Sequence, residues 1–153
     1  SALLNHGGGL GKNRSVVFAD PVWWATHLYS SQTGTVPVAV RLASPTFSTS
    51  GKYLTKRNDV PYVDATALVD AARKTVSVFL INRHTSEGFH VSLAAKGAVV
   101  PPKARASLLA AGDLLARNGW DTPERIGWVE SEVSLTDVTL PPLSLTRVVW
   151  DLR

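Results

Sequence analysis

The sequence predicts an all-β protein, an antiparallel β-sandwich of the jelly-roll or Greek-key type with one short N-terminal helix. Many short apolar segments, several of them alternating with polar residues, are separated by turns rich in glycine and proline, a pattern typical of antiparallel sheets packed face to face. No helical pattern alternates with these segments, as a parallel sheet would require. The 153 residues, of which 44% are hydrophobic, are enough for one domain with its own core.

The N-terminal residues are expected to precede the domain proper. We expect residues 1–4 to be the last turn of a helix and residues 5–12, rich in glycine, to form a loop that leaves it. The chain therefore divides into residues 1–14, a helix end plus a Gly-rich linker, and residues 15–153, the β-sandwich domain. Since the sequence does not begin with Met, we expect Ser1 to be a processed or truncated end.

One helix is predicted after a short strand at residues 15–19. Asp20 can cap the free amides of a helix, and Pro21 suits the first helical position. We expect the helix to run through Trp23, Trp24 and Leu28 towards Ser31, with Gly34 placed to end it.

The apolar segments that follow are predicted strands. Residues 75–81 are almost continuously apolar, which indicates a central strand covered on both faces. Residues 44–58, rich in Ser, Thr, Gly and Lys, are expected to be a long loop, and residues 114–126 to be irregular. The Ala-rich residues 104–116 leave a strand over 104–109 and a helix as alternatives. The other predicted strands are 35–42, 61–69, 89–93 and 146–152, with a final hairpin formed by 133–135 and 138–140.

Composition and charge argue against several classes of protein. The net charge is +4, but the basic residues are scattered and form no block or stripe, so nucleic-acid binding is not predicted. No apolar run is long enough for a membrane span, and there is no cysteine for a disulfide or a thiolate metal site. The compartment stays open between cytoplasmic and secreted.

Catalytic and metal-binding patterns are weak. Hydrolysis of a glycoside needs two carboxyl groups that flank the scissile bond. Glu130 and Glu132 would share one face of a strand, and we interpret them as a solvated edge rather than a catalytic pair. The four His, at positions 6, 27, 84 and 90, do not have the spacing of metal ligands. We therefore predict no catalytic residue, metal site or cofactor in this chain.

Trp23 and Trp24 are the candidate substrate-binding residues, because aromatic faces can stack on sugar rings. Adjacent residues on a helix point about 100° apart, so the two indoles are not expected to form one flat platform. The alternative is that the helix packs its aromatic residues between two domains.

Several segments together resemble the C-terminal β-domain of α-L-arabinofuranosidases of the glycoside hydrolase family 51 type. The order and spacing of the segments carry the resemblance, which extends over nearly the whole chain. They are Ser-Pro-Thr-Phe at 44–47, Val-Pro-Tyr-Val-Asp-Ala-Thr-Ala at 60–67, Val-Ser-Val-Phe-Leu-Ile-Asn-Arg-His at 76–84, Trp-Asp at 120–121 and Leu-Pro-Pro-Leu-Ser-Leu-Thr at 140–146.

The resemblance implies a retaining glycoside hydrolase that releases terminal α-L-arabinofuranosyl residues from arabinan, arabinoxylan or related polysaccharides. In that family a (β/α)₈ barrel performs catalysis and its acid/base follows Asn in an Asn-Glu pair. No Asn-Glu pair occurs in this sequence, so the catalytic residues would lie outside this chain. Residues 1–14 would then contain the end of the last barrel helix.

The resemblance also implies the partners. The chain would pack on and stabilise the catalytic barrel, present in cis or as a separate chain, and it allows a homo-oligomer. An arabinose-containing carbohydrate would be the substrate of the whole enzyme. Without the barrel, we expect an exposed apolar patch on the order of several hundred Å². The alternative is a free-standing carbohydrate-binding or structural β-sandwich module.

Overall fold

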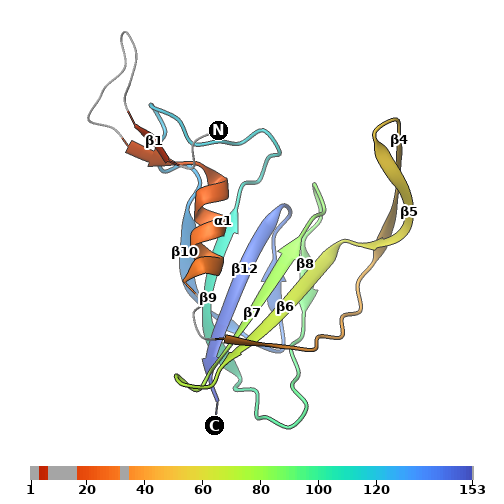
Figure 1. Cartoon of the computed structure of the whole chain (residues 1–153), viewed down its shortest axis with the longest axis vertical. Helices are drawn as coiled ribbons and strands as arrows, with labels where there is room; N and C mark the ends of the chain where they lie inside the picture. Colours follow the sequence, from red (N-terminus) through yellow and green to blue (C-terminus); the bar gives the residue numbers. More distant parts are fainter. Residues whose placement is uncertain (1–3, 7–16, 32–34, 153) are drawn as a thin grey trace.

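The computed structural model describes residues 4–6, 17–31 and 35–152. Its centre is a six-stranded sheet in which every neighbouring pair of strands is antiparallel (Figure 1). The predicted all-β class is thus confirmed. In spatial order the strands are β10 (Trp128–Ser134), β9 (Lys103–Ala110), β12 (Ser144–Asp151), β7 (Thr75–Asn82), β6 (Val63–Asp70) and β3 (Thr35–Val38).

Strand β7 lies inside this sheet and is buried on both faces, as its continuous apolar sequence predicts. Val76, Val78 and Leu80 point to the inner face, where they join the main hydrophobic core. Phe79 points to the outer face and belongs to a second core. The period of two along the strand therefore supplies two separate cores from one segment.

A small second layer covers the inner face. It contains β8 (Phe89–Val91) paired with β11 (Val138–Leu140), together with the irregular chain around them. Leu135, Val138 and Leu140 are fully buried there against the large sheet. The two layers form the predicted sandwich.

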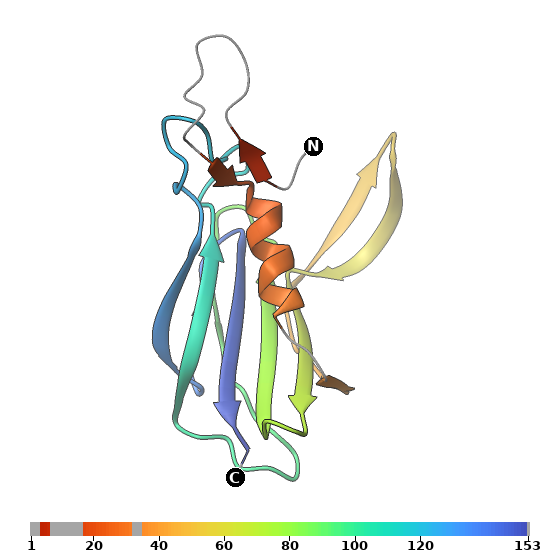
Figure 2. The same cartoon turned by 60° about the vertical axis from the view of Figure 1, so that its left-hand side comes forward.

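Helix α1 (Pro21–Ser30) lies on the outer face of the large sheet (Figure 2). Pro21 occupies the first turn as predicted, and Asp20 has the extended backbone of an N-cap but makes no capping hydrogen bond with its side chain. Leu28 packs with Phe79, Leu109 and Leu145 in the outer core. Gly34 lies outside the described residues. No helix in the described part of the chain has the length and apolar character of a membrane span.

The N-terminal expectation needs correction at Leu4. Leu4 begins strand β1 (Leu4–His6), which pairs with β2 (Val17–Ala19), so it is not the end of a helix. Backbone pairing with the predicted strand around Val17 overrides the local pattern here. Residues 1–3 and 7–16, and with them most of the expected Gly-rich linker, lie outside the described residues.

The expectation of a long loop over residues 44–58 is also wrong. Residues 46–61 form a hairpin of β4 (Thr46–Gly51) and β5 (Leu54–Pro61), which projects from the body in both views (Figures 1 and 2). Its polar composition hides the strand pattern because neither face is buried over most of its length. We call residues 46–61 the arm.

Two further strand predictions change. Residues 133–140 do not form a hairpin, because β10 pairs with β9 while β11 pairs with β8. The turn between them carries the chain from one layer to the other, and the buried Leu135 anchors it in the core. The strand predicted over 35–42 ends at Val38. Of the alternatives for 104–116, the strand is right: β9 pairs on both sides, with β10 and β12.

Residues 111–127 contain no helix or strand, as predicted for 114–126. Asn118 organises this segment from a buried position. Its Nδ2 donates to the carbonyl oxygens of Ala19 and Ile126, each at 2.7 Å, and its Oδ1 accepts the N–H of Ile126 at 2.6 Å. One buried amide therefore joins the irregular segment to β2.

Candidate functional site

The carboxylates considered for catalysis lie on the exposed edge strand β10. Glu130 accepts a hydrogen bond from Ser107 Oγ at 2.7 Å, and Glu132 pairs with Lys103 Nζ at 2.7 Å. The hydrogen bond and the charge of Glu132 raise the pKa of Lys103. Both Glu side chains are exposed and held by neighbouring strand β9, as expected for a solvated edge. Within the described ranges, no group of three or more His, Cys, Asp or Glu is arranged to hold a metal ion.

Trp23 and Trp24 meet on α1, but they do not present a common face. Their ring centroids are 4.8 Å apart and their planes cross at 84°. Trp23 instead stacks on His27 at 4.9 Å, and His27 stacks on Trp128 of β10 at 5.1 Å. Trp24 contacts Trp128 edge to face. The cluster fastens α1 to the sheet; sugar binding by Trp23 and Trp24 stays a prediction.

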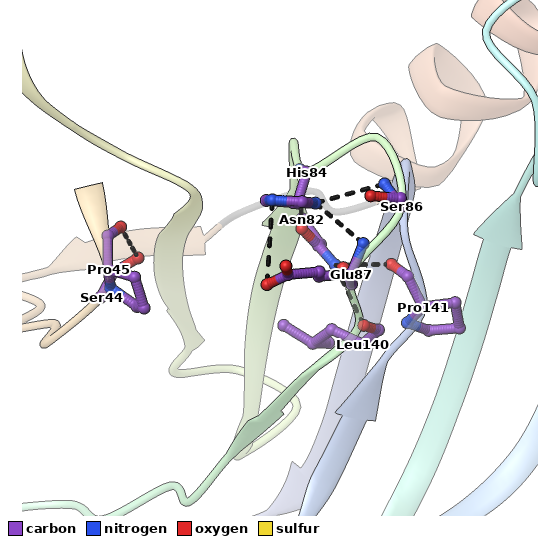
Figure 3. A network of polar contacts seen from close by, with 8 residues as sticks. All are labelled: Ser44, Pro45, Asn82, His84, Ser86, Glu87, Leu140 and Pro141. Atoms are coloured by element: carbon purple, nitrogen blue, oxygen red, sulfur yellow. Dashed lines mark hydrogen bonds and ion pairs between the residues drawn. The ribbon is translucent and has the colours of Figure 1, made fainter. Parts of the chain in front are cut away.

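A polar network at the end of β7 was not singled out from the sequence (Figure 3). Asn82, only 1% exposed, directs its Nδ2 at the carbonyl oxygens of Glu87, Leu140 and Pro141, at 2.9, 3.1 and 2.8 Å. Its Oδ1 accepts the N–H of His84 at 2.9 Å. This one amide holds together β7, the following turn and the connection from β11 to β12.

His84 completes the turn after β7. Its Nδ1 accepts the N–H groups of Ser86 at 3.2 Å and Glu87 at 2.8 Å, so the imidazole holds the backbone of the turn. The ring packs against Tyr62, with centroids 4.5 Å apart. The sequence signal for this network is a polar Asn-Arg-His run directly after an apolar strand, which is a turn signal and does not reveal the partners.

An apolar groove of about 340 Å³ lies on the inner face of the large sheet. Its floor comes from β6 and β7, and its sides come from residues 38–42 and 91–98. The charged residues that line it are Arg41 and Lys96. Val36, Val38 and Val40 are exposed along and beyond the edge strand β3, and Val38 and Val40 also line the groove. The inner face is therefore incompletely covered at this edge.

On the outer face, below α1, one buried side-chain nitrogen has no hydrogen-bond acceptor among the described residues. Arg147 donates from Nη1 to Ser31 Oγ at 2.9 Å, while its Nε is buried without an acceptor among the described residues. Burial lowers the pKa of Arg147, Glu130 opposes that effect, and Arg105 adds to it.

Comparison with known proteins identifies the fold. No protein-family model matches the sequence, and no curated protein matches it significantly. Among solved structures, an α-L-arabinofuranosidase from Thermotoga maritima, crystallised with arabinose, matches with a TM-score of 0.81 at 20% identity, over 92% of this chain and 31% of that one. The thermostable family 51 enzyme from Thermotoga petrophila matches with a TM-score of 0.80 at 20% identity, over 91% of this chain and 30% of that one.

A third family 51 arabinofuranosidase, from Xanthomonas axonopodis pv. citri, has a TM-score of 0.73 at 20% identity, over 92% of this chain and 28% of that one. The chain thus spans about a third of the length of these proteins. The resemblance seen in the sequence is confirmed at the level of the fold: this chain has the fold of one β-domain of family 51 α-L-arabinofuranosidases.

Proposed function

We propose that this chain is the non-catalytic C-terminal domain of an α-L-arabinofuranosidase-like retaining glycoside hydrolase. The whole enzyme releases terminal α-L-arabinofuranosyl residues from arabinose-containing polysaccharides. The observation that carries the proposal is the match over 92% of this chain to 31% of the arabinofuranosidase from T. maritima. In this proposal the chain packs on the catalytic barrel, in cis or as a separate chain, and stabilises it.

The described side chains support a role outside the chemistry. A retaining glycosidase needs two carboxyl groups about 5–5.5 Å apart, with one of them available as a nucleophile. Glu130 and Glu132 lie on an open strand edge and are engaged by Ser107 and Lys103. They therefore lie in an open, solvated setting and not in an enclosed cleft.

The incompletely covered surfaces support a packing role. The exposed valines of β3 and the adjoining groove offer apolar area, and burial stabilises a contact by about 25 cal/mol per Å² of apolar surface. Interfaces between domains of one chain commonly cover roughly 600–1,500 Å².

The test is to compare this chain alone with the assembly that also contains the barrel. Homogeneous isolated chain should release no arabinose from arabinan or from an aryl α-L-arabinofuranoside. The assembly should hydrolyse both, and removal of residues 15–153 should lower its Tm. Turnover by the isolated chain, or a barrel whose Tm is unchanged without this domain, would overturn the proposal. Native mass would reveal a homo-oligomer.

The alternative function is a free-standing carbohydrate-binding module that uses Trp23 and Trp24. The 84° angle between the two indoles speaks against a shared flat platform, although each ring could still contact a sugar on its own. Titration of tryptophan fluorescence with arabino-oligosaccharides decides between this binding module and the non-catalytic domain. A saturable change that disappears in Trp23→Ala would favour the binding module.

A further inference from the structure

We propose that the arm, residues 46–61, is a binding element for acidic polysaccharides that carry uronate carboxylates. Tyr53 lies at the tip of the arm, the turn between β4 and β5, and would stack on a sugar ring. Lys56 and Arg57 lie in β5, which forms the shaft of the arm together with β4, and would bind the carboxylates. The inference rests on the proposed function for the polysaccharide class and extends it by a second carbohydrate contact, made by this chain itself.

The arm is firmly held at its root. Arg83 Nη1 donates to the carbonyl oxygen of Pro61 at 3.0 Å, and Arg83 also forms an ion pair with Asp64. The rings of Phe47 and Tyr62 pack with centroids 4.7 Å apart, and Tyr62 in turn packs on His84. Tyr62, directly after the arm, thus packs on His84 of the turn that Asn82 fixes (Figure 3), so the root of the arm is attached to the body.

The shaft has its own reinforcement where the strand register shifts. Thr49 Oγ1 donates to the carbonyl oxygen of Thr55 at 2.9 Å and accepts the N–H of Arg57 at 3.1 Å. These bonds lie beside the irregularities between Phe47 and Thr49 and between Thr49 and Gly51. A hydroxyl therefore replaces ladder bonds that a bulge would leave unmade, and it holds the backbone at Arg57.

The tip and shaft are then free to meet a ligand. Tyr53 is 88% exposed and Leu54 is 63% exposed, and residues 52–59 are all exposed. Lys52 Nζ lies 5.4 Å from the Tyr53 ring centroid. From Thr46 to Pro61 the arm carries Lys52, Lys56 and Arg57 against Asp59, which is three positive charges minus one negative, or net +2.

This chemistry fits an anionic sugar polymer better than a protein surface. A stable protein interface takes about 800 Å² from each partner, with a hydrophobic centre. The exposed part of the arm offers two large apolar side chains among polar ones. A sugar ring needs one aromatic face, and a uronate adds a carboxylate that a guanidinium binds through two parallel hydrogen bonds. Lys56 and Arg57 point to opposite sides of the strand, so the arm is cationic on both.

The groove on the inner face does not suit the arm of a second copy of this chain. The charged residues lining the groove are Arg41 and Lys96, which would repel the arm. Nucleic acid is therefore the main competing anionic partner, and the experiment separates it from a polysaccharide.

The experiment is affinity electrophoresis of the 153-residue chain in gels that contain polygalacturonate, neutral debranched arabinan or double-stranded DNA. We expect retardation by polygalacturonate that exceeds retardation by the other two. Tyr53→Ala should weaken binding to polygalacturonate about tenfold, the loss of one good contact. The double variant K56A/R57A should weaken binding to polygalacturonate at least as much at about 0.05 M salt. The difference in binding between K56A/R57A and the unchanged chain should shrink at about 0.5 M salt, because screening increases.

The matched control is K96A/R117A, which removes the same charge from exposed positions outside the arm. It should bind polygalacturonate like the unchanged chain, and all variants should keep the same Tm. Equal retardation by DNA, equal losses in the control and the arm variants, or no retardation by polygalacturonate would overturn the proposal. Retardation abolished only by arm variants, with no effect of this domain on the Tm of a barrel, would instead sink the stabilising function and leave the arm proposal standing.

Discussion

The six-stranded sheet and the arm use the same antiparallel pairing, yet different forces hold them. In the sheet, β7 is buried on both faces and supplies two cores. In the arm, β5 is exposed over most of its length, and its order comes from the root at Arg83 and Tyr62 and from the Thr49 hydroxyl. A two-stranded hairpin alone is marginally stable in water. The contrast teaches that the body is maintained by burial and the arm by its attachment.

The largest expected effect comes from truncating matched leucines in the two regions. Leu80→Ala removes a fully buried side chain from the inner core and should lower the free energy of unfolding by about 2–5 kcal/mol. Leu54→Ala in the arm should change it by less than about 0.5 kcal/mol. Urea unfolding measures both. Equal losses would mean that the arm is packed in solution and that the comparison is wrong.

The next effect concerns the junction between body and arm. Asn82→Ala deprives three carbonyl oxygens and one N–H of their partner and should cost about 1–3 kcal/mol or more. Ser144→Ala is the control, because Ser144 Oγ donates to Pro141, one of the same acceptors, at 2.7 Å. That single bond is worth about 0.5–1.5 kcal/mol. A smaller loss in Asn82→Ala than in Ser144→Ala would contradict the central role of Asn82.

A smaller, pH-dependent effect is expected on the outer face of the body. Burial and then the charge of Asp64 raise the pKa of Tyr29 above 10.0, and its ring stacks on Phe79 with centroids 4.3 Å apart. The unfolded chain therefore loses the phenol proton first, so stability should fall as the pH rises through 10 towards the folded pKa. Tyr29→Phe should lack this part of the fall, whereas Tyr53→Phe in the arm should keep it. Urea midpoints measured between about pH 9 and pH 11, one unit on either side of the ordinary tyrosine pKa, would check the difference.

The smallest global effect is expected from Thr49→Val, which removes both hydrogen bonds of the hydroxyl. The free energy of unfolding should change by less than about 0.5 kcal/mol, as for other exposed sites. Proteolytic cleavage within residues 46–61 should accelerate, because local opening of the arm becomes easier. Thr139→Val on the exposed face of β11 is the control and should not alter cleavage there. Unchanged cleavage in Thr49→Val would show that the root alone orders the arm.

The predictable parts of this protein are those in which local pattern and burial agree. Continuous apolar sequence identified β7, and Pro21 marked the first turn of α1. The arm escaped prediction because both of its faces meet water, so alternation carries no signal there. The hairpin expected over residues 133–140 failed for a different reason: sequence proximity favours pairing of neighbours, but Leu135 takes the chain across the core to a new partner strand.

The candidate sites follow the same division. The sequence sufficed to interpret Glu130 and Glu132 as an exposed edge and to exclude a flat platform of Trp23 and Trp24, since both conclusions depend on the geometry of a single strand or helix. It could not place Asn82, whose acceptors Leu140 and Pro141 lie 58 and 59 residues away.

The class of the fold, the central strand, the helix start and the segments that resemble an arabinofuranosidase domain could thus be recognised from the amino-acid sequence. These are local properties, governed by side-chain periodicity and by the dihedral limits of proline and glycine. The strand order, the crossing between layers, the Asn82 network and the projection of the arm emerge only in the folded chain. Each of these depends on contacts between residues distant in the chain, whose free energy no local pattern contains.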